Sequence, residues 1–376
     1  MLALVSALVL FGQFKLPEKL TYGELRALLP VELRAEPGDP KAWKLLQMVE
    51  KAGFGAKDQI SPLLAEWRGK EDPTLLARSH RALVGLKPNL ARLEKALALG
   101  PWAAPFNPAA RYPIPPDYYP DHFDIDAALK LGAKAWVLAA FAASKEGNAT
   151  EALRYVRLSR AVGEKCSNSG SSIIDFLVGG ACQAIADDGA RRLATKPSMS
   201  KDQVALLARS TSKFDNLAAL RNCSRGDFDR SCLVLVGIVP SQMSEPRPKW
   251  INRVFDGHPN LFNARETLMK AVEIWEAALE NTRRPWGKQV DPAGVAREFT
   301  SVLPKEFAGL YPEGPPPASE AQLKKIHDLL RKIDNPIGRV VIDSMMIGSG
   351  NQVMEALQVC RPTAADRPRH CEQLLP

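Results

Sequence analysis

The sequence predicts an all-α fold, an irregular array of helical hairpins arranged as two lobes. Apolar residues recur at steps of three and four along much of the chain, which is the spacing of one helix face. Residues that cap helix N-termini stand before several of these stretches. The composition, 45% hydrophobic and 24% charged, is that of an ordinary globular protein, and 376 residues can bury a sizeable core.

Helical hairpins are expected in the N-terminal part of the chain. Residues 21–24 form a capping box that opens a short helix. Asp39-Pro40 places an N-cap before a proline at the first helical position, and Asp72-Pro73 repeats this device 33 residues later. A second helical segment follows each, at 60–67 and 90–99, so we expect two degenerate hairpins, with chance similarity as the alternative.

The stretch 101–120 carries seven prolines, a density that neither a helix nor a central strand tolerates. It is therefore an extended linker or a strap laid over the helices, and it is the expected domain boundary. A strap is favoured because the stretch contains five aromatic residues, Trp102, Phe106, Tyr112, Tyr118 and Tyr119.

The central stretch Ala127–Lys165 predicts two helices joined by a glycine turn. Gly147 can adopt positive φ, and Asn148 is a good N-cap for the second helix. Trp136 in the first helix, Gly147 eleven positions later and Ala152 five beyond resemble a tetratricopeptide hairpin. The likeness covers one repeat and lacks the usual Leu-Gly pair and tyrosine, so it implies a hairpin and not a regular array.

Further helices follow from capping signals and periodicity. They are expected at 172–195, 200–214, 264–281, 319–333 and 335–357. Gly179-Gly180 within the first of these indicates a close helix contact. Leu233–Val239 is a short apolar run that could be helix or strand.

Three segments resemble a group of uncharacterised, secreted all-helical proteins from planctomycetes and related bacteria. The segments are the GNATEALRYVRLSRAVG hairpin, the IIDFLVGGA helix and the NPIGRVV restart. The resemblance implies an all-helical fold, assigns no activity and carries over no functional residue.

These signals divide the chain into six expected parts. They are a signal segment at 1–12, N-terminal helical hairpins at 13–100, the strap or linker at 101–120, a central helical domain at 121–312, C-terminal helices at 313–360 and a tail at 361–376.

The apolar run Leu2–Phe11 has the length of a signal-peptide core and is too short to span a bilayer. No Lys or Arg precedes it, and Gly12 is the best of poor cleavage sites, so a buried N-terminal helix is the alternative. We expect a secreted or periplasmic protein without a transmembrane span, with a cytoplasmic one as the alternative.

The six cysteines form three pairs that are close in sequence: Cys166 with Cys182, Cys223 with Cys232, and Cys360 with Cys371. These are disulfide candidates whose connectivity spacing cannot decide, and residues 223–232 look like a loop that a disulfide could close. The alternative is buried free thiols in a cytosolic protein. No pair has CxxC spacing, which argues against a zinc or thioredoxin-like site.

One histidine lies among carboxylates, in the stretch around His122, Asp124 and Asp126. The residue types suit a metal ligand or general base. The competing interpretation is that these Asp residues cap the central helix and complement its dipole. Glycine-rich phosphate loops, GxSxG and HExxH are missing from the sequence, and no cofactor or metal is expected.

The net charge is +8, with a sequence pI near 9.1. Arg154, Arg157 and Arg160 form a basic stripe on one helix face, either solvated or docking an acidic partner. No basic-aromatic cluster or nucleic-acid motif accompanies the charge, so a specific nucleic-acid role is not expected.

These observations support three functional hypotheses. The first is a non-enzymatic helical scaffold that binds a protein or peptide partner. The second is a hydrolase with an acidic site around His122. The third is a polyanion-binding protein, whose affinity for heparin would fall steeply with salt.

Overall fold

The protein is all-α, as the sequence predicts. A computed structural model describes residues 20–52, 59–67, 74–105, 107–110, 122–196, 199–210, 214–233, 257–285, 287–303, 319–343 and 356–357, without the side chains of 122–124 and 208–210. Within these ranges every regular element is a helix. None of the described helices is long and apolar enough to cross a bilayer. The expected signal segment, the tail and residues 234–239 lie outside the described ranges.

The chain forms two compact units, each assembled from separate stretches. Unit 1 comprises Met1–Arg34, Asn107–Tyr119 and Ser224–Val359, and unit 2 comprises Ala35–Phe106, Pro120–Cys223 and Cys360–Pro376. The sequence instead predicts parts that follow one another along the chain. Helices that are distant in sequence therefore share a unit.

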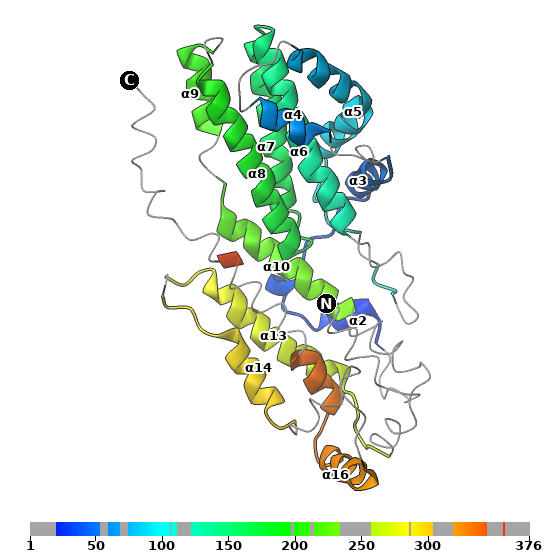
Figure 1. Ribbon diagram of the computed structural model, residues 1–376. Helices are drawn as coiled ribbons and strands as arrows, with labels where there is room; N and C mark the ends of the chain where they lie inside the picture. The colour runs from blue at the N-terminus through cyan, green and yellow to red at the C-terminus, as the bar shows by residue number, and fades with distance from the viewer. Residues whose placement is uncertain are drawn as a thin grey trace. The chain divides into compact units, whose positions relative to one another are not determined.

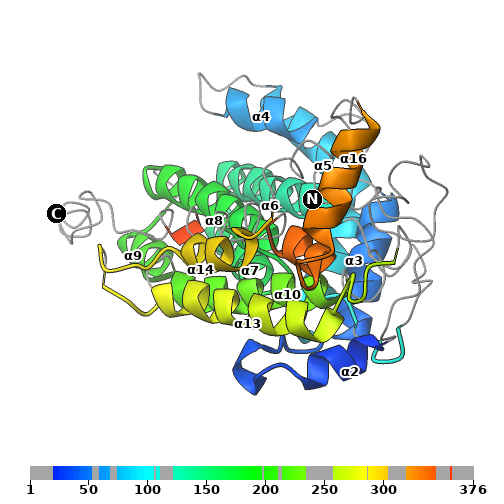
Figure 2. The same cartoon turned by 90° about the horizontal axis from the view of Figure 1, so that it is seen from below.

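Unit 2 contains most of the helices (Figure 1). They are α3 (Pro40–Ala52), α4 (Ile60–Glu66), α5 (Leu75–Leu97), α6 (His122–Lys145), α7 (Ala149–Ser167), α8 (Ile173–Ala194), α9 (Lys201–Ser210) and the first part of α10 (Asn216–Leu233). The helices α6, α7 and α8 pack side by side, and α3 and α5 cover α6 on the flank away from α8 and α9 (Figures 1 and 2).

The predicted central hairpin is α6 and α7. Gly147 has φ of 79°, and the Asn148 side chain accepts a hydrogen bond from the Glu151 amide, so the turn forms as the sequence predicts. Trp136 is 2% exposed and Ala152 is fully buried. The hairpin is present, while the likeness to a tetratricopeptide repeat stays a prediction.

The helices α7 and α8 approach most closely at two glycines. A Cβ on Gly179 would lie 2.5 Å from the carbonyl oxygen of Gly163, and a Cβ on Gly163 would lie 2.7 Å from the amide nitrogen of Gln183. At Gly180 an added Cβ would meet nothing within 4 Å. The predicted close contact is therefore made by Gly179, and Gly180 faces solvent.

Helix α5 differs from its prediction. The sequence indicates a second hairpin with separate segments ending near Val84 and starting near Leu90, whereas α5 is one helix of 23 residues. Pro88 lies inside it at an exposed position. The apolar side chains Leu83, Leu86 and Leu93 keep one buried face across the proline, and their burial holds the helix together despite the missing hydrogen bond.

Of the stretch 101–120, residues 101–105 pack within unit 2, whereas residues 107–110 belong to unit 1 and accept hydrogen bonds from the start of α2. Trp102 is 2% exposed, and its Nε1 donates to the carbonyl of Ala96 over 3.0 Å. Asp39 caps α3 by accepting from the Lys41 amide and also accepts from the amide of Gly100. These backbone donors hold the pKa of Asp39 below its ordinary value. The N-terminus of α3 is thus hydrogen-bonded to the residues that follow α5.

Unit 1 contains α2 (Tyr22–Ala27), the 3₁₀ turn η1 (Val31–Leu33), the second part of α10, α13 (Ala264–Asn281), α14 (Pro292–Thr300), α16 (Glu320–Leu330) and a helical stretch at 336–343. The helices α13 and α14 pack against each other. Helix α14 was not predicted, although Asp291 caps it before Pro292 with the same device that opens α3.

The helical stretch that was predicted to begin at residues 335–336 starts beside a buried side-chain amide. Asn335 has φ of 53° and no exposed surface. Its Oδ1 accepts from the amides of Asn263 and Gly338, and its Nδ2 donates to Thr267 Oγ1 over 3.0 Å. One side chain therefore joins the starts of two helices of unit 1.

Candidate functional site

Positive charge is concentrated on two helices of unit 2, α3 and α5. Together they carry eight basic and two acidic residues, a net charge of +6, against +8 for the whole chain. The two helices pack against each other and lie on the same flank of the unit (Figures 1 and 2). This local concentration of charge makes the flank formed by α3 and α5 the candidate functional surface.

Helix α3 presents its basic residues as a single stripe. Its buried face packs Trp43, Leu46 and Val49 into the core, which leaves the opposite face to solvent. That exposed face consists of Lys41, Lys44, Met48 and Lys51, at steps of three, four and three residues.

Helix α5 repeats this arrangement over a greater length. Its buried face includes Leu83, Leu86 and Leu93, and its exposed face includes Arg81, Val84, Lys87, Pro88 and Lys95. The periodicity that directs the leucines inward therefore sets the basic side chains outward.

Most of the other charges on these helices are already matched. Arg78 pairs with Glu66, and Glu94 pairs with Arg154 of α7 over 2.5 Å. Arg92 donates to Asn89 Oδ1 over 2.6 Å. The exposed side chains of Lys41, Lys44, Lys51, Arg81, Lys87 and Lys95 make no ion pair within the described part of the chain. We call these six residues, with Met48 and Val84 among them, the basic face.

The predicted stripe of Arg154, Arg157 and Arg160 is only partly a surface feature. Arg154 and Arg157 are exposed, and the hydrogen bond that Arg154 donates to Glu94 raises the pKa of Arg154. Arg160 is 6% exposed, and it pairs with Glu164 over 2.9 Å and with Asp187 of α8. The prediction that Arg160 points to solvent is wrong, because its guanidinium joins α7 to α8.

The acidic stretch around His122 also differs from its prediction. Helix α6 begins at His122, so Asp126 is its fifth residue and does not cap it. The Asp126 side chain is 5% exposed and lines a pocket. The side chains of His122 and Asp124 lie outside the described residues, and their proposed roles stay predictions.

The pocket brings together residues from α3, α6, α7, α8 and two connecting segments of unit 2. Its wall includes Trp43, Trp102, Asp126, Cys166, Ser169 and Asp175. Ser169 Oγ donates to Asp175 Oδ2 over 3.0 Å, and Cys166 Sγ donates to the Asp175 carbonyl over 3.2 Å. The empty volume is about 230 Å³, open solvent included, below the roughly 300–1,000 Å³ of common ligand pockets. It can take a small polar group at most.

The cysteines of the described residues are buried free thiols. They are Cys166, Cys182, Cys223 and Cys232, while Cys360 and Cys371 lie outside the described ranges. Cys223 and Cys232 share helix α10, where nine residues rise about 13.5 Å, beyond the ~7 Å Cα separation that a disulfide can bridge. The prediction that a disulfide closes a loop at 223–232 is wrong. Cys166 and Cys182, on α7 and α8, are not bonded either.

Burial keeps three of these thiols, those of Cys166, Cys182 and Cys232, protonated at neutral pH. It raises the pKa of Cys182 to about 12 and the pKa of Cys166 and Cys232 well above the ordinary value. Asp175 raises the pKa of Cys166 further. A thiol nucleophile at neutral pH needs the opposite shift, so these cysteines are packing residues.

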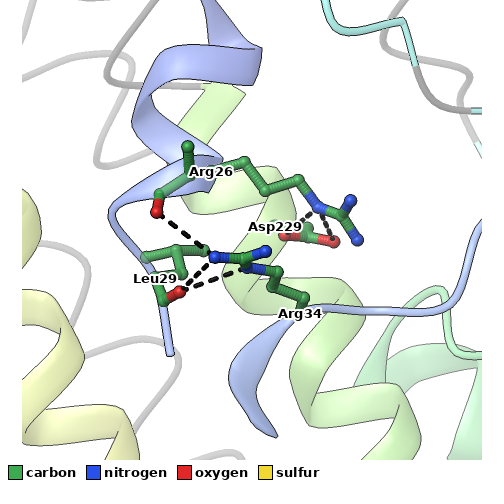
Figure 3. Close-up of polar contacts among 5 residues, drawn as sticks. Arg26, Leu29, Arg34 and Asp229 are labelled. Atoms are coloured by element: carbon green, nitrogen blue, oxygen red, sulfur yellow. Dashed lines mark hydrogen bonds and ion pairs between the residues drawn. The ribbon is translucent and has the colours of Figure 1, made fainter. Parts of the chain in front are cut away.

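Two other arginines, in unit 1, are held by their own unit (Figure 3). Arg26 Nε of α2 donates to both carboxylate oxygens of Asp229 on α10, over 3.3 and 3.4 Å. Arg34 donates to the backbone carbonyls of Leu29 and Ala27, which closes the turn after α2. Because both guanidinium groups have internal acceptors, this pair stabilises unit 1.

The basic face was not identified from the sequence. The available signal was the local charge imbalance of 40–52 and 75–97, which the chain-wide net charge obscures. Identifying it also required knowing that α3 and α5 pack together. In comparisons with known proteins, no family model, curated protein or solved structure matches this chain.

Proposed function

We propose that this protein is a non-enzymatic helical scaffold that docks an acidic protein partner on the basic face of unit 2. The observation that supports this proposal is the net charge of +6 on α3 and α5, with six exposed cations that form no ion pair with a described carboxylate. Like charges held close together on a rigid surface repel, and an acidic partner relieves that repulsion.

Such a surface mainly increases the rate at which the protein and an acidic partner associate. Complementary charge raises association rates from about 10⁵–10⁶ M⁻¹s⁻¹ toward 10⁸–10⁹ M⁻¹s⁻¹ at low salt. The Debye length is about 10 Å at 0.1 M salt, so the attraction is screened as salt rises. Binding through the basic face should therefore be fast and strongly dependent on salt.

Charge reversal tests the proposal. The variant K44E/R81E/K87E removes half of the exposed cations of the basic face, and K288E/K324E/K332E makes the same change in net charge at exposed lysines of unit 1. The probe is a fluorescein-labelled 18-residue polyglutamate, measured by anisotropy at 50 and 300 mM NaCl. We expect the first variant to weaken binding by at least about tenfold at 50 mM salt.

The unit 1 variant should stay within about twofold of the unaltered protein. Equal losses in the two variants would show that only net charge matters, and no binding by the unaltered protein would reject the basic face. Circular dichroism of each variant confirms that the helices are intact.

One observation favours a second candidate function, a hydrolase. Asp126 and Asp175, from different helices, line one buried pocket with Ser169, and paired carboxylates serve as general acid and base in several hydrolases. Because the pocket can take only a small polar group, the test is turnover of a panel of small ester and amide substrates by the unaltered protein and by D126N and D175N. Turnover that survives both substitutions, or none in any sample, rejects this candidate.

A further inference from the structure

We infer that the partner of the basic face is an amphipathic acidic helix, whose apolar side chains contact Met48 and Val84 while its carboxylates meet the surrounding cations. The inference rests on the proposed function, because it concerns the same face. It goes further in stating which class of acidic molecule fits that face.

The first support is the position of the exposed apolar residues. Met48 is 41% exposed and lies between Lys44 and Lys51 on α3, and Val84 is 60% exposed between Arg81 and Lys87 on α5. Each apolar side chain is thus within one helical turn of a cation on either side. A purely charged ligand gains nothing from an apolar group at the centre of its site.

The second support is the open surface beside Val84. A Cβ added at Gly85 would meet nothing within 4 Å, so the residue that follows Val84 also faces open solvent. Pro88, one turn further along α5, is exposed on the same side. Val84 and Pro88 therefore form a small exposed apolar patch on α5 that a partner's apolar side chain can contact.

The third support is the length of the two stripes. Lys41 to Lys51 spans ten residues, about 15 Å along α3, and Arg81 to Lys95 spans fourteen, about 21 Å along α5. A partner helix of 10–14 residues, the usual length in globular proteins, covers that distance. Such a helix carries carboxylates and apolar groups at the three- and four-residue steps that both stripes use.

A phosphate or sulfate polymer is the competing occupant. It would neutralise the same cations, and its affinity would fall with salt, but it has no groups that gain from contact with Met48 or Val84. The two occupants therefore differ in one measurable property, namely whether affinity depends on the apolar residues when every charge is kept.

The experiment compares two variants that change no charge. M48Q/V84S alters the basic face, and M269Q/V302S is its matched control, because Met269 and Val302 of unit 1 are 45% and 50% exposed. The probes are an 18-residue peptide with glutamate on one helical face and leucine on the other, polyglutamate of equal length, and heparin. Full-length protein is used throughout, and anisotropy at 100 mM NaCl gives the affinities.

We expect the unaltered protein to bind the amphipathic peptide at least about tenfold more tightly than polyglutamate. In M48Q/V84S that preference should vanish while polyglutamate affinity is unchanged, and M269Q/V302S should behave as the unaltered protein does. Each substitution lies on an exposed face, so little change in stability is expected.

Two results overturn the inference and leave the proposed function in place. One is equal affinity of the unaltered protein for the two peptides, and the other is a preference that persists in M48Q/V84S. Tight heparin binding without peptide binding would favour the polyanion hypothesis instead. If no acidic probe binds at all, the proposed function fails together with the inference.

Discussion

At the scale of single residues, the same amino-acid type takes opposite roles in neighbouring positions. Arg157 is exposed on α7, whereas Arg160, three residues later, is buried against Glu164 and Asp187. Burial also raises the pKa of Asp187, although Arg160 acts in the other direction. A charged side chain is tolerated inside only where such partners converge, and sequence spacing alone does not show where they converge.

The buried thiols predict how stability depends on pH. Burial raises the pKa of Cys182 from its ordinary value of 9.0 to about 12, so its contribution to stability is fully present below pH 9 and is lost as pH rises toward 12. We expect the free energy of unfolding to fall above pH 9, by up to about 1.4 kcal/mol per pH unit for each such thiol. Urea titrations at pH 8 to 11 measure it.

The variant C182A is the control for this prediction, since alanine does not titrate. Its loss of stability between pH 9 and 11 should be smaller than that of the unaltered protein, whatever its stability at pH 8. Parallel curves for the two proteins would show that other groups control the alkaline transition.

At the scale of elements, capping and periodicity place most helices correctly. Asn148 of α7, Ser172 of α8 and Asn263 of α13 all accept hydrogen bonds from backbone amides of their own helices. The sequence can predict where such helices begin, because the capping side chain and the backbone amide that it binds are only three residues apart. The cysteine spacing was misleading at residues 223–232, where it indicated a loop and the structure shows helix α10.

The contact between α7 and α8 gives a prediction with an internal control. In G179A the new methyl group would lie 2.5 Å from the Gly163 carbonyl oxygen and 2.3 Å from the Ser167 amide nitrogen, which are backbone atoms that cannot turn aside. We expect a loss of about 1–3 kcal/mol, as for other overpacked sites.

The substitution G180A, one residue further along α8, should have the opposite effect. Its methyl group would enter open space, and alanine favours a helix interior by about 0.5–1 kcal/mol over glycine. Chemical unfolding curves of both variants test this pair of predictions. A neutral G179A would mean that the two helices separate easily at this contact.

At the scale of the whole molecule, the two units are discontinuous in sequence. Unit 2 joins residues 35–106 to 120–223, and these stretches carry the packing of α3 and α5 on α6. The predicted central domain, 121–312, includes α6 but excludes α3, α4 and α5. Its apolar residues would lose partners such as Trp67, whose ring lies tilted with its centroid 5.8 Å from that of Phe141.

Fragments can therefore distinguish the two divisions of the chain. We expect residues 35–223 to fold alone, with a cooperative thermal transition, because they keep the core of unit 2. Residues 121–312 should show a broad transition and bind a dye specific for exposed apolar surface. Circular dichroism and dye fluorescence provide both measurements, and equal cooperativity of the two fragments would refute the division into these units.

The sequence by itself determined the all-α class, the central hairpin, the caps and the close contact near Gly179, because each depends on residues within a few positions of one another. Only the tertiary structure decided that Arg160 is buried, that Asp126 and Asp175 share a pocket, and that α3 and α5 bring their lysines and arginines to one flank. Those features depend on which helices pack together. Packing is set by the complementarity of whole faces, which local spacing does not encode.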